Sequence, residues 1–238
     1  MKTFAKLFAS LGIFAFASVA SAQQIHIKAR FVEVPKETLE ALQKDFGVAS
    51  DGTELLTPEQ MSTTLQEFES DSSVKELAAP EVTTTSGRQT QMRTTTIQTI
   101  LTNFVAQETS TSTNIVAQTE EMECGPMLDI ISTVSSDGLK IGLTTTASVT
   151  KFLGYDKPPA IHPKDGELSL PVVLPKFEVK KASAQTSVPD GQTLILFGKS
   201  NNVENQLNSR SSGEQELLVV MITPTIVDAA GNRIHLDN

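Results

Sequence analysis

The stretch from Pro80 to Val227 has many strand patterns and few helical ones, and this constrains the fold more than any other feature of the sequence. Thr is abundant in it and Val and Ile are frequent, which favours β structure. Ser-Ser-Asp-Gly at 135–138 and Pro-Asp-Gly at 189–191 are typical of tight turns between antiparallel strands. The sequence therefore predicts a long antiparallel meander, and the pattern alone leaves open whether it forms an open sheet or a barrel.

Within this stretch, the spacing of apolar residues predicts the individual strands, over 81–85, 88–103, 114–123, 127–134, 139–150, 177–188, 193–197 and 216–227. Pro224 is expected to interrupt the last of them. Residues 154–175 hold five prolines and predict a loop or an edge segment, because proline cannot serve a central ladder. Polar connections are expected at 108–113 and 201–213, and a final turn at 229–232.

The residues before Pro80 mix one strand with helical patterns. Apolar residues alternate from Ile25 to Phe31, which predicts a half-buried strand, and the phase slips at Val32. A bulge, or burial on both faces, would explain the slip. Helices are predicted over about 35–46 and from the capping box at 57–60 to about Ser70. The expected fold class is α+β and mostly β, with one strand and two short helices before the meander.

The first 22 residues have the features of a secretory signal peptide. Two lysines precede an apolar run over 7–19, and Ala20-Ser21-Ala22 fits a cleavage site. The alternative, a membrane anchor, needs roughly 20 apolar residues. We therefore expect an exported protein divided into a signal peptide (1–22), a strand-helix-helix portion (23–78) and a β-rich core (79–238). No later stretch is apolar enough for a membrane-spanning helix, so a membrane would be met through strands or the surface.

Composition excludes several kinds of chemistry. The net charge of -9 argues against a nucleic-acid partner, which would need clustered Lys and Arg. A single cysteine excludes an internal disulfide and a multi-cysteine metal site. His26, His162 and His235 are far apart in the sequence, so surface positions are favoured over metal ligation. Cys124 is interpreted as a small half-buried hydrophobe, the alternatives being a nucleophile or an intermolecular bridge.

Acidic residues gather around one predicted strand, at Glu120, Glu121, Glu123 and Asp129. They could bind a cation loosely, but a solvated strand edge is the favoured interpretation. None of the serine-nucleophile motifs is present, and no glycine-rich turn opens a helix to hold a phosphate. The sequence predicts neither an enzyme nor a cofactor, and an exported hydrolase would need a triad or a metal site.

Five segments, in the same order, resemble the C-terminal secretin domain of type II and type III secretion systems and type IV pili. They are 27–34, 77–84, the hairpin of 125–143, the turn of 188–195 and the closing strand of 216–227. The Asp-Gly turns are common individually, whereas five ordered blocks that end on a Thr-Pro strand are specific. The positions that carry the resemblance are Glu33, Pro80, Gly125, Asp137, Gly138, Asp190, Gly191, Thr223 and Pro224.

The sequence also departs from the family pattern. Residues 199–213 are polar where the family has a Val-Pro-x-Leu-Gly stretch, and the usual glycine after the first long strand is missing. The mature chain is expected to start almost directly at the secretin domain, without the periplasmic N domains or a pilotin-binding extension. The resemblance is therefore to a minimal or divergent secretin.

This resemblance implies a homo-oligomer, or a complex with another secretin-type subunit, in the outer membrane or periplasm of a bacterium. Copies would form a ring-shaped multimeric β-barrel for protein secretion, and neighbouring strands would cover one another's edges. The Thr-rich strands over 88–123 suit a water-filled lumen or a solvated face, and 5% aromatic residues without Trp leave little for an aromatic girdle. The alternative is a periplasmic structural module of the same fold that forms no pore and pairs by strand edges.

Overall fold

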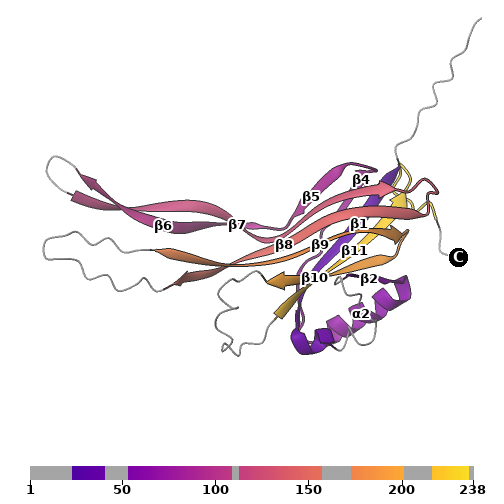
Figure 1. Cartoon of the computed structure of the whole chain (residues 1–238), viewed down its shortest axis with the longest axis horizontal. Coiled ribbons are helices and arrows are strands. Elements are labelled where there is room, and N and C mark those ends of the chain that lie inside the picture. The colour runs from indigo at the N-terminus through magenta and orange to yellow at the C-terminus, as the bar shows by residue number, and fades with distance from the viewer. Residues whose placement is uncertain (1–22, 41–52, 109–112, 157–172, 201–215, 236–238) are drawn as a thin grey trace, which may run out of the picture.

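The computed structural model describes residues 23–40, 53–108, 113–156, 173–200 and 216–235. It is an elongated molecule with a two-layer body at one end and two hairpins that project from it (Figure 1). The predicted signal peptide, the polar connections at 109–112 and 201–213, and residues 157–172 of the proline-rich segment lie outside the described residues.

The first layer is built around one long antiparallel pairing. Strand β1 (Gln24–Pro35) runs antiparallel to β11 (Glu216–Val227) over its whole length. On the far side of β1 lie β3 (Lys75–Ala78) and β4 (Glu81–Thr85), which pair with different parts of it. On the far side of β11 lies β10 (Thr193–Ser200), whose other edge pairs with β2 (Thr53–Leu56).

The second layer contains β5 (Gln89–Arg93), β7 (Thr113–Val134), β8 (Lys140–Asp156) and β9 (Leu174–Pro189). Strand β6 (Thr96–Glu108) pairs with the first half of β7. The end of β10 joins the layers by pairing with β9, which gives the order β3-β1-β11-β10-β9-β8-β7-β5. In the described residues this path does not close, so the meander is an open sheet folded over on itself. The expected mostly-β α+β class is confirmed.

The main core lies between the two layers. From the first layer, β1 contributes its alternating apolar residues Ile25 to Phe31, all 2% exposed or less. The second layer faces them with residues such as Leu128, Ile130 and Ile141. Burying one such side chain stabilises the fold by about 1.5–3 kcal/mol. The period-two pattern in the sequence is therefore the direct signature of this core.

A second core lies on the other face of β1 and explains why the alternation ends at Phe31. Val32 and Val34 pack there against α2 (Pro58–Ser70), whose Phe68 is 7% exposed. The pairing of β1 with β3 also shifts register between Phe31 and Val32. Both explanations of the phase slip, a bulge and burial on both faces, are therefore confirmed.

The predicted capping box starts α2 as expected. Gln60 N donates to Thr57 Oγ1 over 3.3 Å, and Thr57 N donates to Gln60 Oε1 over 2.9 Å. The first predicted helix is confirmed over residues 36–40, and its remaining part lies outside the described residues.

Three strand predictions need correction. The strand expected over 88–103 is two strands, β5 and β6, separated at residues 94–95. The segments 114–123 and 127–134 are one continuous 22-residue strand, β7. Residues 154–156 and 174–175, expected in a loop or edge segment, are the paired ends of β8 and β9, and they are edge segments because β7 no longer pairs with β8 there. Strand β11 continues through Pro224, for a reason that lies in the neighbouring turn.

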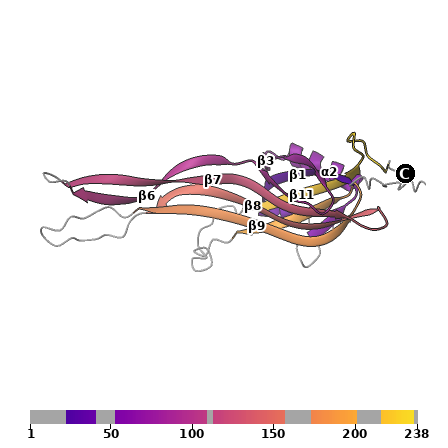
Figure 2. The same cartoon turned by 90° about the horizontal axis from the view of Figure 1, so that it is seen from above.

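The two projecting hairpins, β6–β7 and β8–β9, extend in the same direction from the body (Figure 2). They touch where Leu101 N donates to the Tyr155 hydroxyl over 2.8 Å. The ring of Phe152 packs edge-on against Tyr155 at 5.2 Å and lies 5.5 Å from Phe177, between ring centroids. The hydrogen bond joins the two hairpins, and the ring contacts pack Tyr155 within the β8–β9 hairpin.

Candidate functional site

A buried charged cluster lies where the hairpins leave the body. Glu33 of β1 follows the inward-facing residues of that strand and is 1% exposed. Its Oε1 accepts a hydrogen bond from Lys180 Nζ of β9 over 2.7 Å, and its Oε2 accepts one from Lys151 Nζ of β8. Because β1 belongs to one layer and β8 and β9 to the other, this carboxylate joins the layers at the base of the β8–β9 hairpin.

The cluster continues toward the surface through alternating charges. Lys151 Nζ lies 4.0 Å from Glu216 Oε2, and Glu216 Oε1 is 2.6 Å from Lys75 Nζ. Lys180, with a side chain that is 4% exposed, also lies 3.9 Å from Glu178 Oε1. Lys180, which is buried, and Lys151, which is partly exposed, thus each have a second carboxylate nearby.

The two lysines keep Glu33 ionised. Burial by itself would raise the pKa of this carboxyl, but the hydrogen bonds from Lys151 and Lys180 and their positive charges lower it below the ordinary value of 4.5. A buried pair of this kind adds little net stability compared with apolar residues, but removing one partner is costly. The arrangement serves to position the strands and holds no nucleophile.

A second organising site is the β9–β10 turn around Asp190, at the end of the body away from the hairpins. Asp190 Oδ1 accepts a hydrogen bond from Ile226 N over 2.8 Å, and Oδ2 lies 2.9 Å from His235 Nδ1. The Asp190 backbone N–H donates to Leu139 O over 3.1 Å. One side chain, 7% exposed, therefore joins the turn, β11 and the C-terminal residues.

The same turn explains why β11 tolerates proline. Gly191 N donates to Pro224 O over 3.0 Å, so Pro224 faces the turn and not the ladder of β10. The N–H that proline lacks is needed by no strand there. Gly191 has a φ of +78°, and an added Cβ would lie 2.3 Å from Arg233 Nη2. Thr223 Oγ1 forms a 2.7 Å hydrogen bond with Thr193 Oγ1, which ties the start of β10 to β11.

Gly125 marks the point where β7 changes partners. Before it β7 pairs with β6, and after it with β5 and β8. Its φ is +132°, and an added Cβ would lie 2.5 Å from Thr94 O. Thr94 N in turn donates to Pro126 O over 2.9 Å. The break between β5 and β6 lies opposite Gly125, and the two backbones come very close there. We call this point the strand crossing, and only a residue without a side chain fits at Gly125.

The remaining family-motif positions form turns and junctions. Asp137 Oδ1 accepts from Ser135 Oγ over 2.5 Å and from Leu139 N over 3.0 Å, and these bonds lower the pKa of its carboxyl. Gly138 follows with a φ of +72°. Pro80 lies between β3 and β4, where its carbonyl accepts from Ala29 N over 2.9 Å.

The structure separates the other residues that the sequence singled out. His26 Nδ1 lies 3.0 Å from Thr83 Oγ1, and His162 lies outside the described residues. Cys124 is buried with a free thiol, next to the strand crossing. In the described ranges no group of three His, Cys, Asp or Glu could hold a metal ion, and no helix there is long and apolar enough to cross a membrane.

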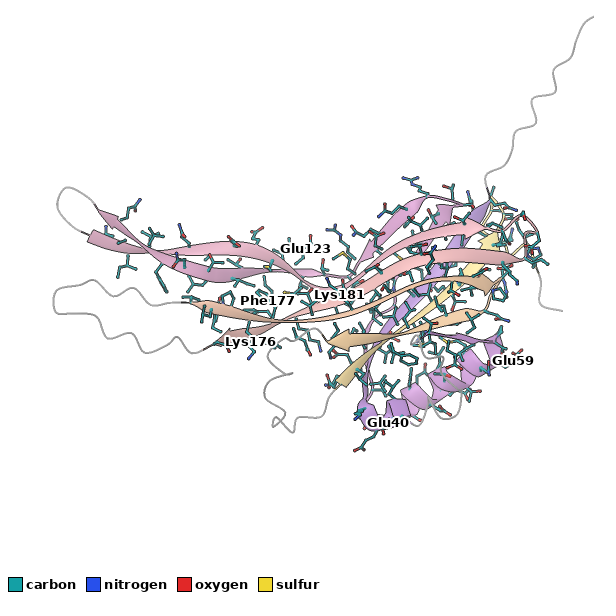
Figure 3. The ribbon with its side chains drawn as sticks, viewed as in Figure 1. Glu40, Glu59, Glu123, Lys176, Phe177 and Lys181 are labelled. Carbon is teal, nitrogen blue, oxygen red and sulfur yellow. The ribbon has the colours of Figure 1, made fainter. Side chains whose placement is uncertain are left out.

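The acidic residues on β7 also do not form one site. Glu123 receives hydrogen bonds from Arg93, and Asp129 receives them from Gln89. Glu120 and Glu121 are exposed on the projecting part of the strand. Figure 3 shows Glu123 on the β6–β7 hairpin, with Lys176 and Phe177 on β9 of the other hairpin.

The projecting parts of the hairpins are strands exposed to solvent, and one of them carries exposed apolar side chains. Beyond the pair Gly125↔Thr150, β7 no longer pairs with β8, and each hairpin is a two-stranded ribbon. Residues 114–123 of β7 are exposed on both faces of the strand. The exposed apolar side chains of the β6–β7 hairpin, which we call the hairpin apolar set, are Ile97, Val105, Ile115, Val116 and Met122.

Sequence reasoning missed the partners of Glu33. Lys151 and Lys180 occupy inward-facing positions of β8 and β9, in phase with buried residues such as Val149 and Ala182. A lysine in phase with an apolar face is the signal that could have indicated a buried carboxylate partner.

Comparison with known proteins gives one family and several solved structures. Residues 67–211, more than half of the chain, match the Secretin family, described as bacterial type II and III secretion system protein. No curated protein matches the sequence. The fold is similar to the secretin-domain β-barrel of InvG from the Salmonella SPI-1 injectisome, at 13% identity and a TM-score of 0.41 over 88% of this chain and 66% of that one.

Two further secretins are similar in structure. The type II secretin GspD of enteropathogenic Escherichia coli has 13% identity and a TM-score of 0.39, over 88% of this chain and 71% of that one. The type IV competence pilus secretin PilQ of V. cholerae has 10% identity and a TM-score of 0.36, over 87% of this chain and 61% of that one. The chain thus spans between 61% and 71% of the lengths of the three solved relatives.

Proposed function

The chain belongs to the secretin family of bacterial type II and III secretion system proteins, and from this premise we propose that its copies assemble into a ring in the bacterial envelope. The ring is a multimeric β-barrel that serves protein secretion. Residues 1–22 direct export as a signal peptide, and the mature protein acts in the outer membrane or periplasm. The role is structural, with no catalytic step and no cofactor.

The observation that carries this proposal is the pair of projecting two-stranded hairpins. A two-stranded hairpin is marginally stable in water by itself, because no third strand pairs with it. The hairpin apolar set is exposed, and in the described residues the outer edge of β6 pairs with no strand. Neighbouring copies would pair these edges and bury these side chains, so neither an unpaired strand edge nor an exposed apolar surface would remain.

The charged cluster supports the same role. A ring of identical copies requires that every hairpin leave its body in the same direction. Glu33 connects β1 to the base of the β8–β9 hairpin, and Tyr155 connects that hairpin to β6. Both hairpins are therefore held in one orientation before any neighbour binds, which lowers the entropy lost on assembly.

A second candidate function is a periplasmic module of the same fold that forms no pore. The observation that favours it is the charge on the β6–β7 hairpin, where Glu120, Glu121 and Glu123 follow one another closely on β7. Because neighbouring residues of a strand point to opposite faces, both faces carry a carboxylate. A lipid-facing wall should be apolar on one face, and this ribbon is not.

The test is fractionation of cells that express the full chain, followed by native electrophoresis and negative-stain imaging of the extracted protein. We expect heat-labile rings in the outer-membrane fraction. The variant Ile115→Asp should remain folded and fail to form rings, because Ile115 is 50% exposed and belongs to the hairpin apolar set. Leu139→Asp is the matched control, since Leu139 is 57% exposed at the opposite end of the molecule.

The outcomes separate the two candidates. A soluble periplasmic monomer or dimer would contradict the ring and leave the second candidate. Rings that persist in Ile115→Asp would refute the role of the hairpins in assembly. Rings that form but conduct no ions in a planar bilayer would refute the open channel.

A further inference from the structure

A groove lies on the helical side of the first layer, between the C-terminal half of α2 and strand β3. Its volume is about 260 Å³, and we call it the α2–β3 groove. Val32 and Phe68, which are 3% and 7% exposed, form part of its floor. Leu65 and Val74 complete the floor, and both are partly exposed and pack against the second core. The floor is therefore apolar.

The size of the groove suits a single side chain. A cavity of about 150 Å³ with apolar walls is large enough to hold a benzene ring. A groove of about 260 Å³ therefore accommodates one large apolar or aromatic side chain. Sites for small molecules usually have about 300–1,000 Å³. A side chain presented by another protein thus fits this groove better than a free ligand does.

The rim of the groove is acidic. Glu69 is exposed on the last turn of α2 and forms no ion pair with another described residue. Hydrogen bonds from Ser73 and Thr38 lower the pKa of Asp71 below its ordinary value of 3.8, so this carboxylate is charged at neutral pH. Glu76 Oε2 accepts a hydrogen bond from Arg30 Nη1 over 2.9 Å, and this pair is neutral as a whole.

The helix beside the groove has the same sign of charge. Residues 57–73 contain three glutamates and one aspartate and no lysine or arginine. Figure 3 shows Glu40 and Glu59 at the surface of the helical part of the molecule. Charges of one sign on a surface attract partners of the opposite sign and disfavour others. A partner that places an apolar side chain on the floor should therefore carry positive charges beside it.

We propose that the α2–β3 groove is a docking site for a basic segment of a partner protein. One large apolar side chain of that segment occupies the floor, and flanking Lys or Arg side chains lie beside Glu69 and Asp71. An apolar anchor in a small pocket supplies most of the affinity of such a contact, and the charges orient it. The groove uses neither hairpin, so this docking is independent of ring assembly.

A second copy of this chain is a poorer occupant. Among the described residues, Ile234 is the exposed large apolar side chain with a basic residue on each side, Arg233 and His235. Ile234 N donates to Ile226 O over 3.1 Å, and Ile226 pairs with Ile25 near the start of β1. The groove adjoins Val32, toward the other end of β1. Equivalent residues in a ring lie at one height, so Ile234 of one copy would not reach the groove of the next.

The test uses the absence of tryptophan from this chain. The probe is the synthetic peptide Lys-Arg-Trp-Arg-Lys, titrated with residues 23–238 of the protein. Its tryptophan is the only one in the sample, and its emission moves to shorter wavelength when the indole ring enters an apolar site. The salt concentration is about 0.15 M, at which exposed charges more than about 8 Å apart are largely screened.

Two variants change the groove, and one variant is the matched control. Glu69→Lys reverses a charge at the rim, and Val74→Phe fills part of the floor. Glu67→Lys makes the same change of charge at an exposed position of the same helix that does not line the groove. Circular dichroism checks that each variant is folded.

We expect a saturable shift of the tryptophan emission with a Kd below about 1 mM. Glu69→Lys should weaken binding about fivefold or more, because an attraction becomes a repulsion. Val74→Phe should weaken it about tenfold or more, because the anchor loses its site. Glu67→Lys should stay within about twofold of the unaltered protein. If Val74→Phe does not fold, competition replaces it, and Lys-Arg-Ser-Arg-Lys should compete about tenfold more weakly than the probe.

Several results would overturn the proposal. Equal weakening by Glu67→Lys and Glu69→Lys would show that the peptide responds only to net charge. Unchanged binding to folded Val74→Phe, or equal competition by the serine peptide, would exclude the apolar floor as the anchor site. No emission shift at about 1 mM peptide would exclude the groove as a site for basic segments. Self-association that Glu69→Lys abolishes and Glu67→Lys preserves would identify a second copy as the occupant.

Discussion

Replacing Glu33 by Gln should destabilise the body strongly, although the two side chains have nearly the same shape. Removing one partner from a buried ion pair costs about 3–5 kcal/mol, because the other charge stays buried without compensation. Lys180, 4% exposed, would keep only Glu178 at 3.9 Å, whereas Lys151 is 34% exposed and can regain water. The expected loss therefore lies at the lower end, at about 3 kcal/mol.

This loss is large on the scale of the whole fold. Domains are stable by about 5–15 kcal/mol, and each kcal/mol shifts Tm by about 2–4 °C at this chain length. The variant should therefore melt about 6–12 °C lower. The assays are thermal melting and urea unfolding of residues 23–238, both followed by far-UV circular dichroism at one protein concentration. Glu81→Gln is the control, since Glu81 is 52% exposed and pairs with Lys28 at 3.7 Å, which is worth about 0–1 kcal/mol.

A double variant tests whether the loss comes from the buried charge. Lys180→Met removes the stranded ammonium group, so Glu33→Gln combined with Lys180→Met should lose less stability than the sum of the two single variants. The difference should be about 1–3 kcal/mol. A cost below about 1 kcal/mol for Glu33→Gln, or strict additivity in the double variant, would refute the reasoning.

The same carboxylate predicts an acid-dependent loss of stability. The folded pKa of Glu33 is lowered below its ordinary value of 4.5, so the unfolded chain binds its proton first as the pH falls. Its contribution is fully present above 4.5 and is lost as the pH falls through the folded pKa. Glu33→Gln should lack this part of the pH dependence when unfolding is measured between neutral pH and pH 3.

Three further changes test the strand crossing, the β9–β10 turn and the helix cap. Gly125→Ala should lower the free energy of unfolding by more than about 3 kcal/mol in thermal melts, because its Cβ would lie 2.5 Å from Thr94 O. Gly87→Ala is the control and should cost about 1 kcal/mol, since Gly87 has a φ of +83° and its Cβ would meet no atom within 4 Å. Asp190→Ala should cost about 1–3 kcal/mol and speed hydrogen exchange at the amide that it caps; unchanged exchange would contradict that capping. Thr57→Ala should lower the free energy of unfolding by about 1 kcal/mol in urea unfolding. A loss below about 0.3 kcal/mol would show that α2 does not depend on its capping box.

Local signals predicted much of the fold. The capping box located the start of α2, and the Asp-Gly turns located the ends of β7, β9 and their partners. The alternation from Ile25 to Phe31 located β1 and its buried face. In each case the residues that decide the structure lie within a few positions of one another, so a single sequence contains the information.

The errors arose where distant residues decide the structure. Strand β5 ends before Thr94 because the backbone passes close to Gly125 there, and no residue near Thr94 in the sequence indicates a break. Pro224 stays within β11 because the turn at Gly191 accepts it. Glu33 was identified through a family resemblance, but its lysine partners are 118 and 147 positions away, and only the folded chain brings them together.

The continuity of β7 has a mechanical consequence. At about 3.3 Å per residue, its 22 residues form a rod of about 70 Å that runs from the hairpin through the body. A pull along this rod loads its hydrogen bonds to β5 and β8 in shear, so many of them must break together. A sideways pull would instead peel them apart one pair at a time. We therefore expect β7 to resist a force along its axis more strongly than a force that bends it sideways.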